Sequence, residues 1–168
     1  MIQIMKATAN HIEGIARVCA EGYRQTYKKL CAKEYIDRTI QEFYNVDRLQ
    51  SELEKPEGWD GWIVAVENNV VIGAGGGGMI GDEEGELFVL YLDPTRRGEG
   101  IGTLLLEEIT RLQVENGAKY QWVSVLKDNE KGIPFYEARG FKFVSEVSTF
   151  AAKDTDPYIS LRYKRKLL

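Results

Sequence analysis

Histidine and cysteine are scarce in this sequence, and their scarcity excludes several kinds of chemistry. The 168 residues include one histidine, His11, and two cysteines, Cys19 and Cys31. A zinc site made of Cys and His needs closely spaced ligands, and that spacing is missing. A Ser-His-Asp or Cys-His catalytic site would depend on His11, at the start of an expected helix. We therefore expect no metal, and chemistry performed by carboxylates, tyrosines, backbone groups or a bound cofactor.

Long hydrophobic segments and an excess of basic charge are also missing. The longest uncharged run, residues 68–81, is too short and too rich in glycine to span a bilayer. Residues 1–6 lack the basic start and apolar stretch of a signal peptide, which predicts a cytoplasmic protein without a membrane partner. With 22 basic and 26 acidic residues the formal net charge is −4, so nucleic acid is not an expected partner.

The composition is typical of a folded domain, with 43% apolar and 29% charged residues. No linker or internal repeat divides the chain, so residues 1–168 are expected to form one domain. Helical periodicity covers residues 12–23, 34–54 (as one helix or two), 101–112 and 134–139. Strands are expected at residues 2–7, 62–66, 70–72, 87–92, 120–126, 141–147 and 158–167. The order βααβββαβαββ predicts a mixed α/β (α+β) domain, with a largely antiparallel seven-stranded sheet flanked by helices.

Three glycines separate the strand at residues 87–92 from the helix that follows. Gly98, Gly100 and Gly102 let the main chain approach a ligand closely and turn without a side-chain clash. The N–H groups at the helix start form a receptor for phosphate, and Arg97 adds a positive charge. The pattern favours a phosphate-bearing cofactor, although a plain strand-to-helix turn is the alternative for the loop by itself.

The spacing of these glycines distinguishes between classes of cofactor. The loop lacks the Gly-Lys-Ser/Thr ending of a Walker loop. Its G-x-G-x-G pattern also differs from the G-x-G-x-x-G fingerprint of dinucleotide-binding domains, and the next strand, residues 121–125, does not end in the acidic residue of that fingerprint. A nicotinamide-dependent oxidoreductase is therefore disfavoured.

Two blocks of sequence around this helix form a more specific pattern. The first is Arg97-Gly98-Glu99-Gly100-Ile101-Gly102, which matches R/Q-x-x-G-x-G/A between a strand and a helix. The second is Asn129 followed by Phe135-Tyr136-Glu137-Ala138-Arg139-Gly140-Phe141, which matches N…FYxxxGF. Together they resemble the GCN5-related N-acetyltransferase (GNAT) family, and the order of elements along the whole chain fits it. The resemblance implies the GNAT fold and an acetyl-CoA-dependent N-acetyltransferase.

The resemblance also implies where acetyl-CoA binds. In this family the pyrophosphate lies on the glycine loop, and the pantetheine arm pairs with the strand before the loop through its two amides. That strand diverges from the strand at 120–126, and the acetyl group lies in the gap. The residues expected to bind the cofactor are Leu90, Tyr91, Leu92, Arg97, Gly98, Glu99, Gly100, Ile101, Gly102, Thr103, Asn129, Phe135 and Tyr136.

Acetyl transfer to an amine needs a base for the acceptor and an acid for the departing sulfur. Tyr136 matches the family's tyrosine general acid, and its ordinary pKa of about 10 suits a donor to a thiolate. Packing under the cofactor is its alternative role. Glu86 lies where many family members carry a glutamate that acts as base through water, and a period of two places it on one strand face with Phe88, Leu90 and Leu92. A solvated acidic turn at residues 82–86, with water alone as the base, is the alternative.

The acceptor is less defined. The first helices usually build its pocket in this family, and they carry Tyr23, Tyr27, Tyr35 and Tyr44, which also suit a core. The carboxylates of residues 82–86 would attract a cationic amine. We expect a primary amine of a small molecule, such as a polyamine, or of a peptide or protein. A non-catalytic acyl-CoA-binding module is the alternative function, and a homodimer is compatible with the sequence.

Glycine is concentrated in one further segment, since residues 73–85 hold seven of the 17 glycines. A strand of this composition carries few side chains that could pack against a neighbour. The sequence favours either a bulged, deformable lip next to the acceptor or a poorly packed edge strand.

Overall fold

The computed structural model describes residues 1–54, 56–149 and 158–167. Its strands are β1 (Gln3–Lys6), β2 (Ile63–Glu67), β3 (Val70–Met79), β4 (Glu84–Leu92), β5 (Tyr120–Leu126), β6 (Lys142–Ser148) and β7 (Ile159–Lys166). Its α-helices are α1 (Ile12–Tyr27), α2 (Lys33–Phe43), α3 (Val46–Glu52), α4 (Ile101–Glu115) and α5 (Gly132–Glu137). The predicted order is confirmed, with the segment at 34–54 forming two helices. They separate at Asn45, whose side chain accepts a hydrogen bond from Arg48 N and caps α3.

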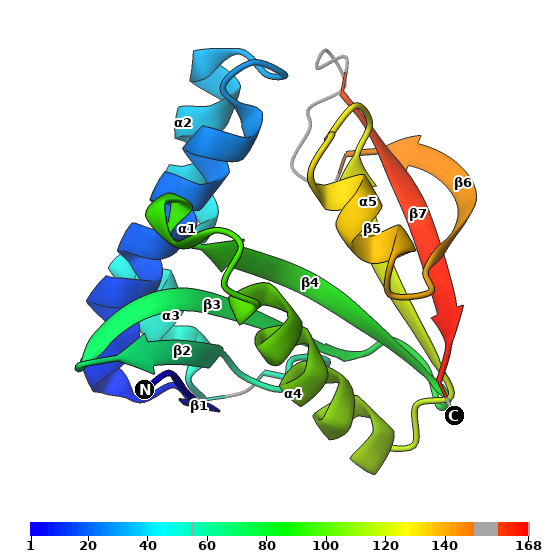
Figure 1. Cartoon of the computed structure of the whole chain (residues 1–168), viewed down its shortest axis with the longest axis horizontal. Coiled ribbons are helices and arrows are strands. Elements are labelled where there is room, and N and C mark those ends of the chain that lie inside the picture. The colour runs from blue at the N-terminus through cyan, green and yellow to red at the C-terminus, as the bar shows by residue number, and fades with distance from the viewer. Residues whose placement is uncertain (55, 150–157, 168) are drawn as a thin grey trace.

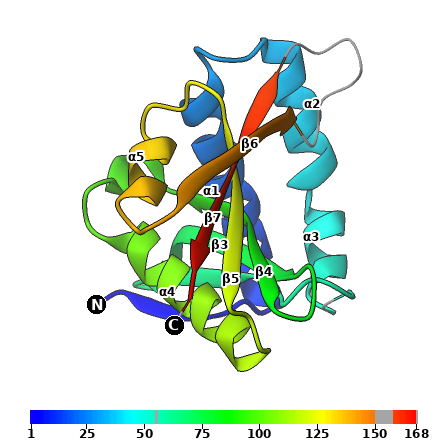
Figure 2. The ribbon, with the colours of Figure 1, turned by 90° about the vertical axis from the view of Figure 1, so that its right-hand side faces the viewer.

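The strands form one seven-stranded sheet in the order β1-β2-β3-β4-β5-β7-β6. Neighbouring strands are antiparallel except for β4 and β5, which are parallel. Helices α1, α2 and α3 lie on one side of the sheet, and α4 and α5 lie on the other (Figure 2). The prediction of a mixed α/β domain with a largely antiparallel seven-stranded sheet is therefore confirmed.

Most of the glycine-rich segment lies in β3, and the alternative of a poorly packed edge strand is wrong. β3 lies between β2 and β4, and most of its residues are buried. A Cβ at Gly73 would come within 3.0 Å of the Ile101 and Leu105 side chains, and one at Gly77 within 2.1 Å of the Glu86 carbonyl oxygen. The missing side chains thus let α4 and β4 pack directly on the β3 main chain.

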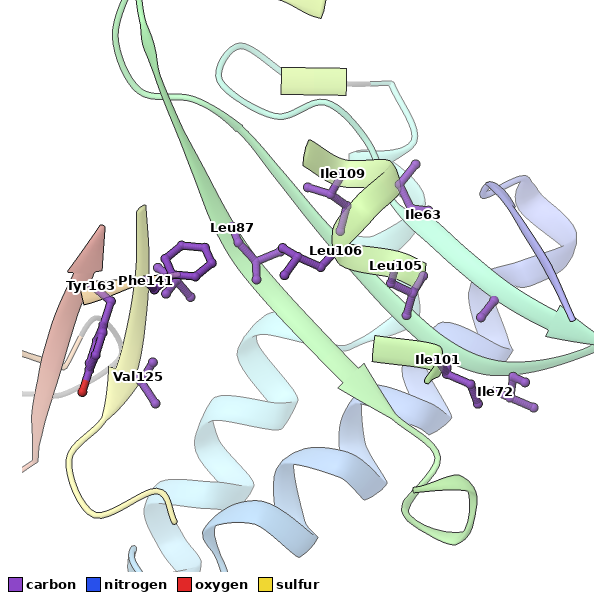
Figure 3. Close-up of a cluster of buried hydrophobic side chains, with 12 residues drawn as sticks. Ile63, Ile72, Leu87, Ile101, Leu105, Leu106, Ile109, Val125, Phe141 and Tyr163 are labelled. Atoms are coloured by element: carbon purple, nitrogen blue, oxygen red, sulfur yellow. The ribbon is translucent and has the colours of Figure 1, made fainter. Parts of the chain in front are cut away.

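The hydrophobic core lies on both faces of this strand. Figure 3 shows the cluster on the α4 side, where Ile101, Leu105 and Ile109 of α4 meet strand residues that include Leu87. This cluster continues to Val125, Phe141 and Tyr163, so it joins the two halves of the sheet. On the opposite face, α1 and α3 pack against β2 and β3, with Ile15, Val18 and the predicted core residue Cys19 buried.

The parallel strands β4 and β5 pair over only part of their length. Their register runs from Glu84 opposite Tyr120 to Leu87 opposite Val123, after which the strands diverge (Figure 1). Buried amides hold the paired end: Gln113 Nε2 of α4 donates to the Glu86 carbonyl oxygen at 2.9 Å, and its Oε1 accepts from Gln121 Nε2 of β5 at 3.1 Å. We call the paired part the base of the fork and the divergent part its open end.

Two negative findings apply to the described residues. None of the helices there combines the length and the apolar character that crossing a bilayer requires. Within the same residues, no three His, Cys, Asp or Glu side chains gather in a way that could bind a metal ion.

Candidate active site

The open end of the fork contains a cavity of about 160 Å³, which we call the fork cavity. Its walls come from the end of α1, from β4 and β5, and from the segment that leads into α5. Eight of the predicted cofactor residues border it: Leu90, Tyr91, Leu92, Arg97, Gly102, Asn129, Phe135 and Tyr136. The two sequence blocks, far apart in the chain, therefore meet at one cavity.

The glycine loop continues from one edge of the fork cavity. Gly98 and Gly100 have φ angles of 82° and 79°, which strongly favour glycine, and a Cβ at either position would contact nothing within 4 Å. Gly100 is the N-cap of α4 and has no side chain to cap the first turn. The loop therefore combines open space with N–H groups that need partners, as an anion site requires.

Three predicted residues of the loop have other partners. Glu99 binds Arg96, with a 2.7 Å distance from Arg96 Nε to Glu99 Oε2, and Arg96 also binds Glu67. Ile101 is fully buried in the core. The Thr103 hydroxyl accepts from Arg139 Nη2 at 2.5 Å. These three side chains shape the loop, so a ligand would meet its main chain and the exposed Arg97 side chain.

Asn129 holds the entry to α5. Its Oδ1 accepts a hydrogen bond from Gly132 N at 2.9 Å, and the side chain is largely buried in the wall of the fork cavity. A Cβ at Gly132 would come within 2.6 Å of Asn129 Nδ2, so this close contact requires glycine. The predicted asparagine thus borders the cavity opposite β4.

Tyr136 is held between aromatic rings on α5. Its ring centroid lies 5.1 Å from that of Phe135 and 5.5 Å from that of Phe141, both in edge-to-face geometry. Burial, with a smaller contribution from nearby Tyr27, raises the pKa of Tyr136, so the phenol keeps its proton at neutral pH. Arg139 stacks on Phe135, with its guanidinium carbon 3.8 Å from the Phe135 ring centroid.

A larger cavity of about 670 Å³ lies next to the fork cavity, and we call it the aromatic groove. The predicted tyrosines Tyr23, Tyr27, Tyr35 and Tyr44 line it, together with Phe43, Trp59, Trp62 and Phe88. Tyr23 and Tyr35 are also buried, so these residues act both as core and as wall. The charged side chains in its lining are Arg48, Glu52, Glu86 and Arg162.

Glu86 lies in the wall of the aromatic groove, and the expectation about its strand face is wrong. Gly76 pairs with Val89 and Gly77 with Leu87, so Phe88 is an extra residue in a β-bulge. The bulge reverses the alternation. Leu90 and Leu92 join the core on the α4 side, whereas Val89 and Tyr91 join the α1 side. The Glu86 side chain therefore lies in the aromatic groove, on the same strand face as Val89 and not on the face that carries Leu90 and Leu92.

Sequence reasoning missed the partner of Glu86. Arg162 of β7 donates to both carboxylate oxygens, with distances of 2.7 Å from Nη1 to Oε2 and 3.1 Å from Nη2 to Oε1. Arg162 Nη1 also donates to Ser124 Oγ of β5 at 2.9 Å. One guanidinium thus joins β4, β5 and β7 where the fork begins to open. Since 76 residues separate Arg162 from Glu86, no local pattern indicates the pair.

Two other carboxylates of the acidic run have partners as well. Glu83 binds Lys119 at 2.5 Å, and Glu84 binds Lys164 at 3.2 Å and accepts from Trp122 Nε1 at 3.0 Å. Asp82 and Glu83 lie in the exposed turn between β3 and β4, as the solvated-turn alternative predicted, whereas Glu84 and Glu86 belong to β4. Glu52 is the other carboxylate of the aromatic groove and accepts a hydrogen bond from Trp62 Nε1 at 3.0 Å.

Two residues border both cavities: Tyr27, at the end of α1, and Ser124, on β5. They mark the place where the fork cavity and the aromatic groove meet. The family resemblance had placed Tyr27 with the other tyrosines of the first helices, near the acceptor. Nothing in the sequence singled out Ser124, because its place depends on where β4 and β5 separate.

Comparison with known proteins agrees with this geometry. The sequence profile of the acetyltransferase (GNAT) family matches residues 23–141, well over half of the chain. A spermidine N(1)-acetyltransferase from Thermoplasma acidophilum is 28% identical over 143 residues, which cover 84% of this chain and 88% of that protein. An uncharacterized N-acetyltransferase of Bacillus subtilis, YuaI, is also 28% identical, over 87% of this chain and 83% of its own length.

Solved structures show the same fold. A PaiA N-acetyltransferase from Thermoplasma acidophilum, crystallised in complex with coenzyme A, superposes with a TM-score of 0.83 at 25% identity and covers 99% of both chains. A GCN5-related N-acetyltransferase from Rhodopseudomonas palustris gives a TM-score of 0.80 at 15% identity, over 98% of this chain and 95% of the other.

Proposed function

Because the chain belongs to the acetyltransferase (GNAT) family, we propose that it transfers the acetyl group of acetyl-CoA directly to a primary amine at the junction of the fork cavity and the aromatic groove. The observation that carries this proposal is the meeting of the two sequence blocks, with Tyr136, at the open end of the fork. The similar PaiA N-acetyltransferase was crystallised with coenzyme A, which supports the assignment of the cofactor.

The described residues fit acetyl-CoA. The pairing of β4 with β5 stops at Leu87. Leu90, Tyr91 and Leu92 therefore have main-chain groups on the side of the fork cavity, and the two amides of pantetheine can form hydrogen bonds with these groups. The main chain of residues 97–102 and the exposed Arg97 side chain suit the pyrophosphate. Asn129 would bind the arm from the opposite wall. The cofactor supplies an activated acetyl thioester, and these residues hold and orient it.

Tyr136 acts as the general acid in this proposal. It borders the fork cavity but not the aromatic groove, as a group that protonates the departing CoA sulfur should. Its phenol is protonated at neutral pH and can donate a hydrogen bond, and then the proton, to the departing thiolate.

Glu86 acts as the base through water. Arg162 occupies one acceptor position on each carboxylate oxygen, and the remaining lone pairs can accept hydrogen bonds from water in the groove. The ion pair fixes the orientation of the carboxylate, and this positioning favours proton transfer over a short water bridge.

The acceptor binds in the aromatic groove. Its tyrosine and tryptophan rings can enclose an alkyl chain and contact an ammonium group. Glu52 and Glu86, each paired with an arginine, supply carboxylate oxygens that can accept hydrogen bonds from the amine. The similar spermidine N(1)-acetyltransferase supports a polyamine as the small-molecule acceptor. The experiment that tests this choice is an acceptor series of spermidine, a monoamine of equal length and a lysine-containing peptide. We expect the lowest KM for spermidine, and a lower KM for the peptide would assign a protein acceptor.

Ligand-induced stabilisation tests the cofactor. Acetyl-CoA at one hundred times its Kd should add about 2.7 kcal/mol to the free energy of unfolding, because it binds only the folded chain. Gly100→Val should abolish this gain, since a side chain would occupy the open space over the loop. Gly140→Val is the matched control: its φ of 92° imposes similar strain, and Gly140 lies outside the glycine loop, between α5 and β6. Stabilisation by NADH but not by acetyl-CoA would contradict the proposal.

A further inference from the structure

The roles proposed above do not use Tyr27, although it lies between the residues that carry them. It borders the fork cavity, which Tyr136 shares, and the aromatic groove, which Glu86 shares. Under the proposed function, on which this inference rests, the acetyl carbon and the amine nitrogen must meet where the two cavities join. A side chain at that junction contacts the reacting atoms.

The packing of α1 places Tyr27 there. Gly22 lies against β4, and a Cβ on it would come within 3.0 Å of Tyr91 Cβ and 3.1 Å of the Leu92 carbonyl oxygen. The absence of a side chain lets the last turns of α1 rest directly on the open end of β4. The Tyr27 ring is then fixed by an edge-to-face contact with Tyr23, at a centroid distance of 4.5 Å.

The Tyr27 hydroxyl can donate a hydrogen bond. Burial raises the pKa of Tyr27, and the interaction with the Tyr91 hydroxyl opposes this effect only in part. The phenol therefore stays protonated at neutral pH. A hydroxyl can accept one hydrogen bond and donate another, so contact with Tyr91 still allows the Tyr27 hydroxyl to donate to an acceptor at the junction. Tyr136 is close enough for the two hydroxyls to influence each other electrostatically.

We propose that Tyr27 is a further catalytic residue, whose hydroxyl donates a hydrogen bond to the acetyl carbonyl oxygen at the junction of the two cavities. When the amine nitrogen forms its bond to the carbonyl carbon, the π-electron pair moves onto that oxygen. The pair returns when the carbon–sulfur bond breaks, and the sulfur leaves with the bonding electrons. Glu86, through water, takes the amine proton and Tyr136 protonates the sulfur. Tyr27 stabilises the transient charge without losing its proton.

The direct test is the stretching frequency of the thioester carbonyl, measured by difference infrared spectroscopy with acetyl-CoA carrying ¹³C at the carbonyl and no amine present. A hydrogen bond to the oxygen weakens the C=O bond and lowers its frequency. We expect Tyr27→Phe to raise the frequency of bound acetyl-CoA relative to wild type. Tyr35→Phe, which removes a hydroxyl from the groove alone, should leave it unchanged. An equal frequency in wild type and Tyr27→Phe would overturn the inference.

Steady-state kinetics provide a second test of the role proposed for Tyr27. Tyr27→Phe should lower kcat by about 10²-fold, the low end for loss of one such donor, with little change in the Kd for acetyl-CoA. Full turnover in this variant would also overturn the inference. Failure of acetyl-CoA to bind wild type at all is a different result, because it would contradict the proposed function itself.

Ser124 keeps the inference testable if Tyr27→Phe does not fold. Ser124 is exposed, so Ser124→Val should fold and narrow the junction while leaving Tyr27 in place. We expect amine turnover to fall with acetyl-CoA binding retained. Ser124→Ala removes the same hydroxyl, and with it the bond from Arg162, without added bulk, so its turnover is the baseline against which the effect of the added bulk is measured. Equal turnover in the Val and Ala variants would show that the reacting groups do not meet at this junction.

Discussion

The two ends of the β4–β5 fork differ in how their main chains are satisfied. At the base, Glu84–Leu87 pairs with Tyr120–Val123, the Gln113–Gln121 amides bridge the α4 side, and the Glu86–Arg162 pair bridges the groove side. At the open end this pairing stops, and Leu90–Leu92 border a cavity instead. The structure thus concentrates its cross-strand bonds at one end of the same two strands.

This difference explains how a parallel pair can remain open. Two diverging strands would close if pairing were gained along their whole length, because unpaired main-chain groups in a protein interior are costly. The side-chain hydrogen bonds on both faces of the base, together with the bulge at Phe88, fix the angle between the strands. The open end can then offer its main chain to a ligand. We expect changes at the open end to affect rate and binding, and changes at the base to affect stability first.

The largest expected effect lies at the open end, at Tyr136. Tyr136→Phe keeps the ring between Phe135 and Phe141 and removes only the hydroxyl. We expect kcat to fall about 10²-fold, equivalent to about 2.7 kcal/mol, with little change in KM for acetyl-CoA or in stability. Steady-state kinetics and thermal unfolding of the same preparation measure both. Normal acetyl-CoA binding with full turnover would mean that Tyr136 only packs.

The next effect lies where the base ends, at Glu86. Glu86 and Arg162 have side-chain exposures of only 13% and 20%, so Glu86→Gln leaves a guanidinium poorly compensated. We expect the free energy of unfolding to fall by about 1.5–3 kcal/mol, and turnover to fall mainly below the pKa of the acceptor amine, where a base is needed.

Glu84→Gln is the control for this experiment, because it removes a more exposed ion pair, with Lys164, from the base without touching the groove. It should cost less stability and leave the pH–rate profile unchanged. Equal stability losses in the two variants would contradict the special place of Glu86. An unaltered pH–rate profile in Glu86→Gln would assign the base to water alone.

The sequence predicted the open end better than the base. The glycine loop and the Phe135-Tyr136 block are local patterns, and residues from both meet at the fork cavity. The Glu86–Arg162 pair joins residues 76 positions apart, and the bulge at Phe88 depends on the register between β4 and β3. Burial of the glycine-rich β3 was missed for a related reason: the partners that fill the space above Gly73 and Gly77 come from α4 and β4.

High pH should weaken the open end more than the base. Burial raises the pKa of Tyr23, Tyr44 and Tyr91, which pack together beside it. A raised folded-state pKa gives stability that is full below the unfolded value of about 10 and is lost as the pH rises through the folded value. Each tyrosine should contribute a slope of up to about 1.4 kcal/mol per pH unit above pH 10.

Tyr91→Phe removes one of these ionisations and should make the alkaline decline in stability shallower. Tyr120→Phe, at the start of β5 and outside the cluster, should not. Chemical denaturation at several pH values between 9 and 11 measures the slopes. Identical slopes in wild type and Tyr91→Phe would contradict the role given to the cluster.

The smallest expected effect concerns acceptor selection at Glu52. Its side chain is 20% exposed in the wall of the aromatic groove. Glu52→Gln should raise KM for a dicationic amine about fivefold, equivalent to about 1 kcal/mol, and change KM for a monoamine less. Glu54→Gln, an exposed carboxylate outside the groove, is the control. Equal changes for both amines would show that Glu52 does not contact the second charge.

The central claim is that acetyl transfer to an amine occurs at the open end of the fork. Its most direct test is the rate of CoA thiol release from saturating acetyl-CoA, measured across a series of primary amines with wild-type protein and Tyr136→Phe, with the acetylated amine identified by mass spectrometry. We predict release that depends on the amine, matches the acetylated product one to one, and is about 10²-fold slower in Tyr136→Phe. Tight acetyl-CoA binding without amine-dependent release for any acceptor would contradict the claim and identify a binding module.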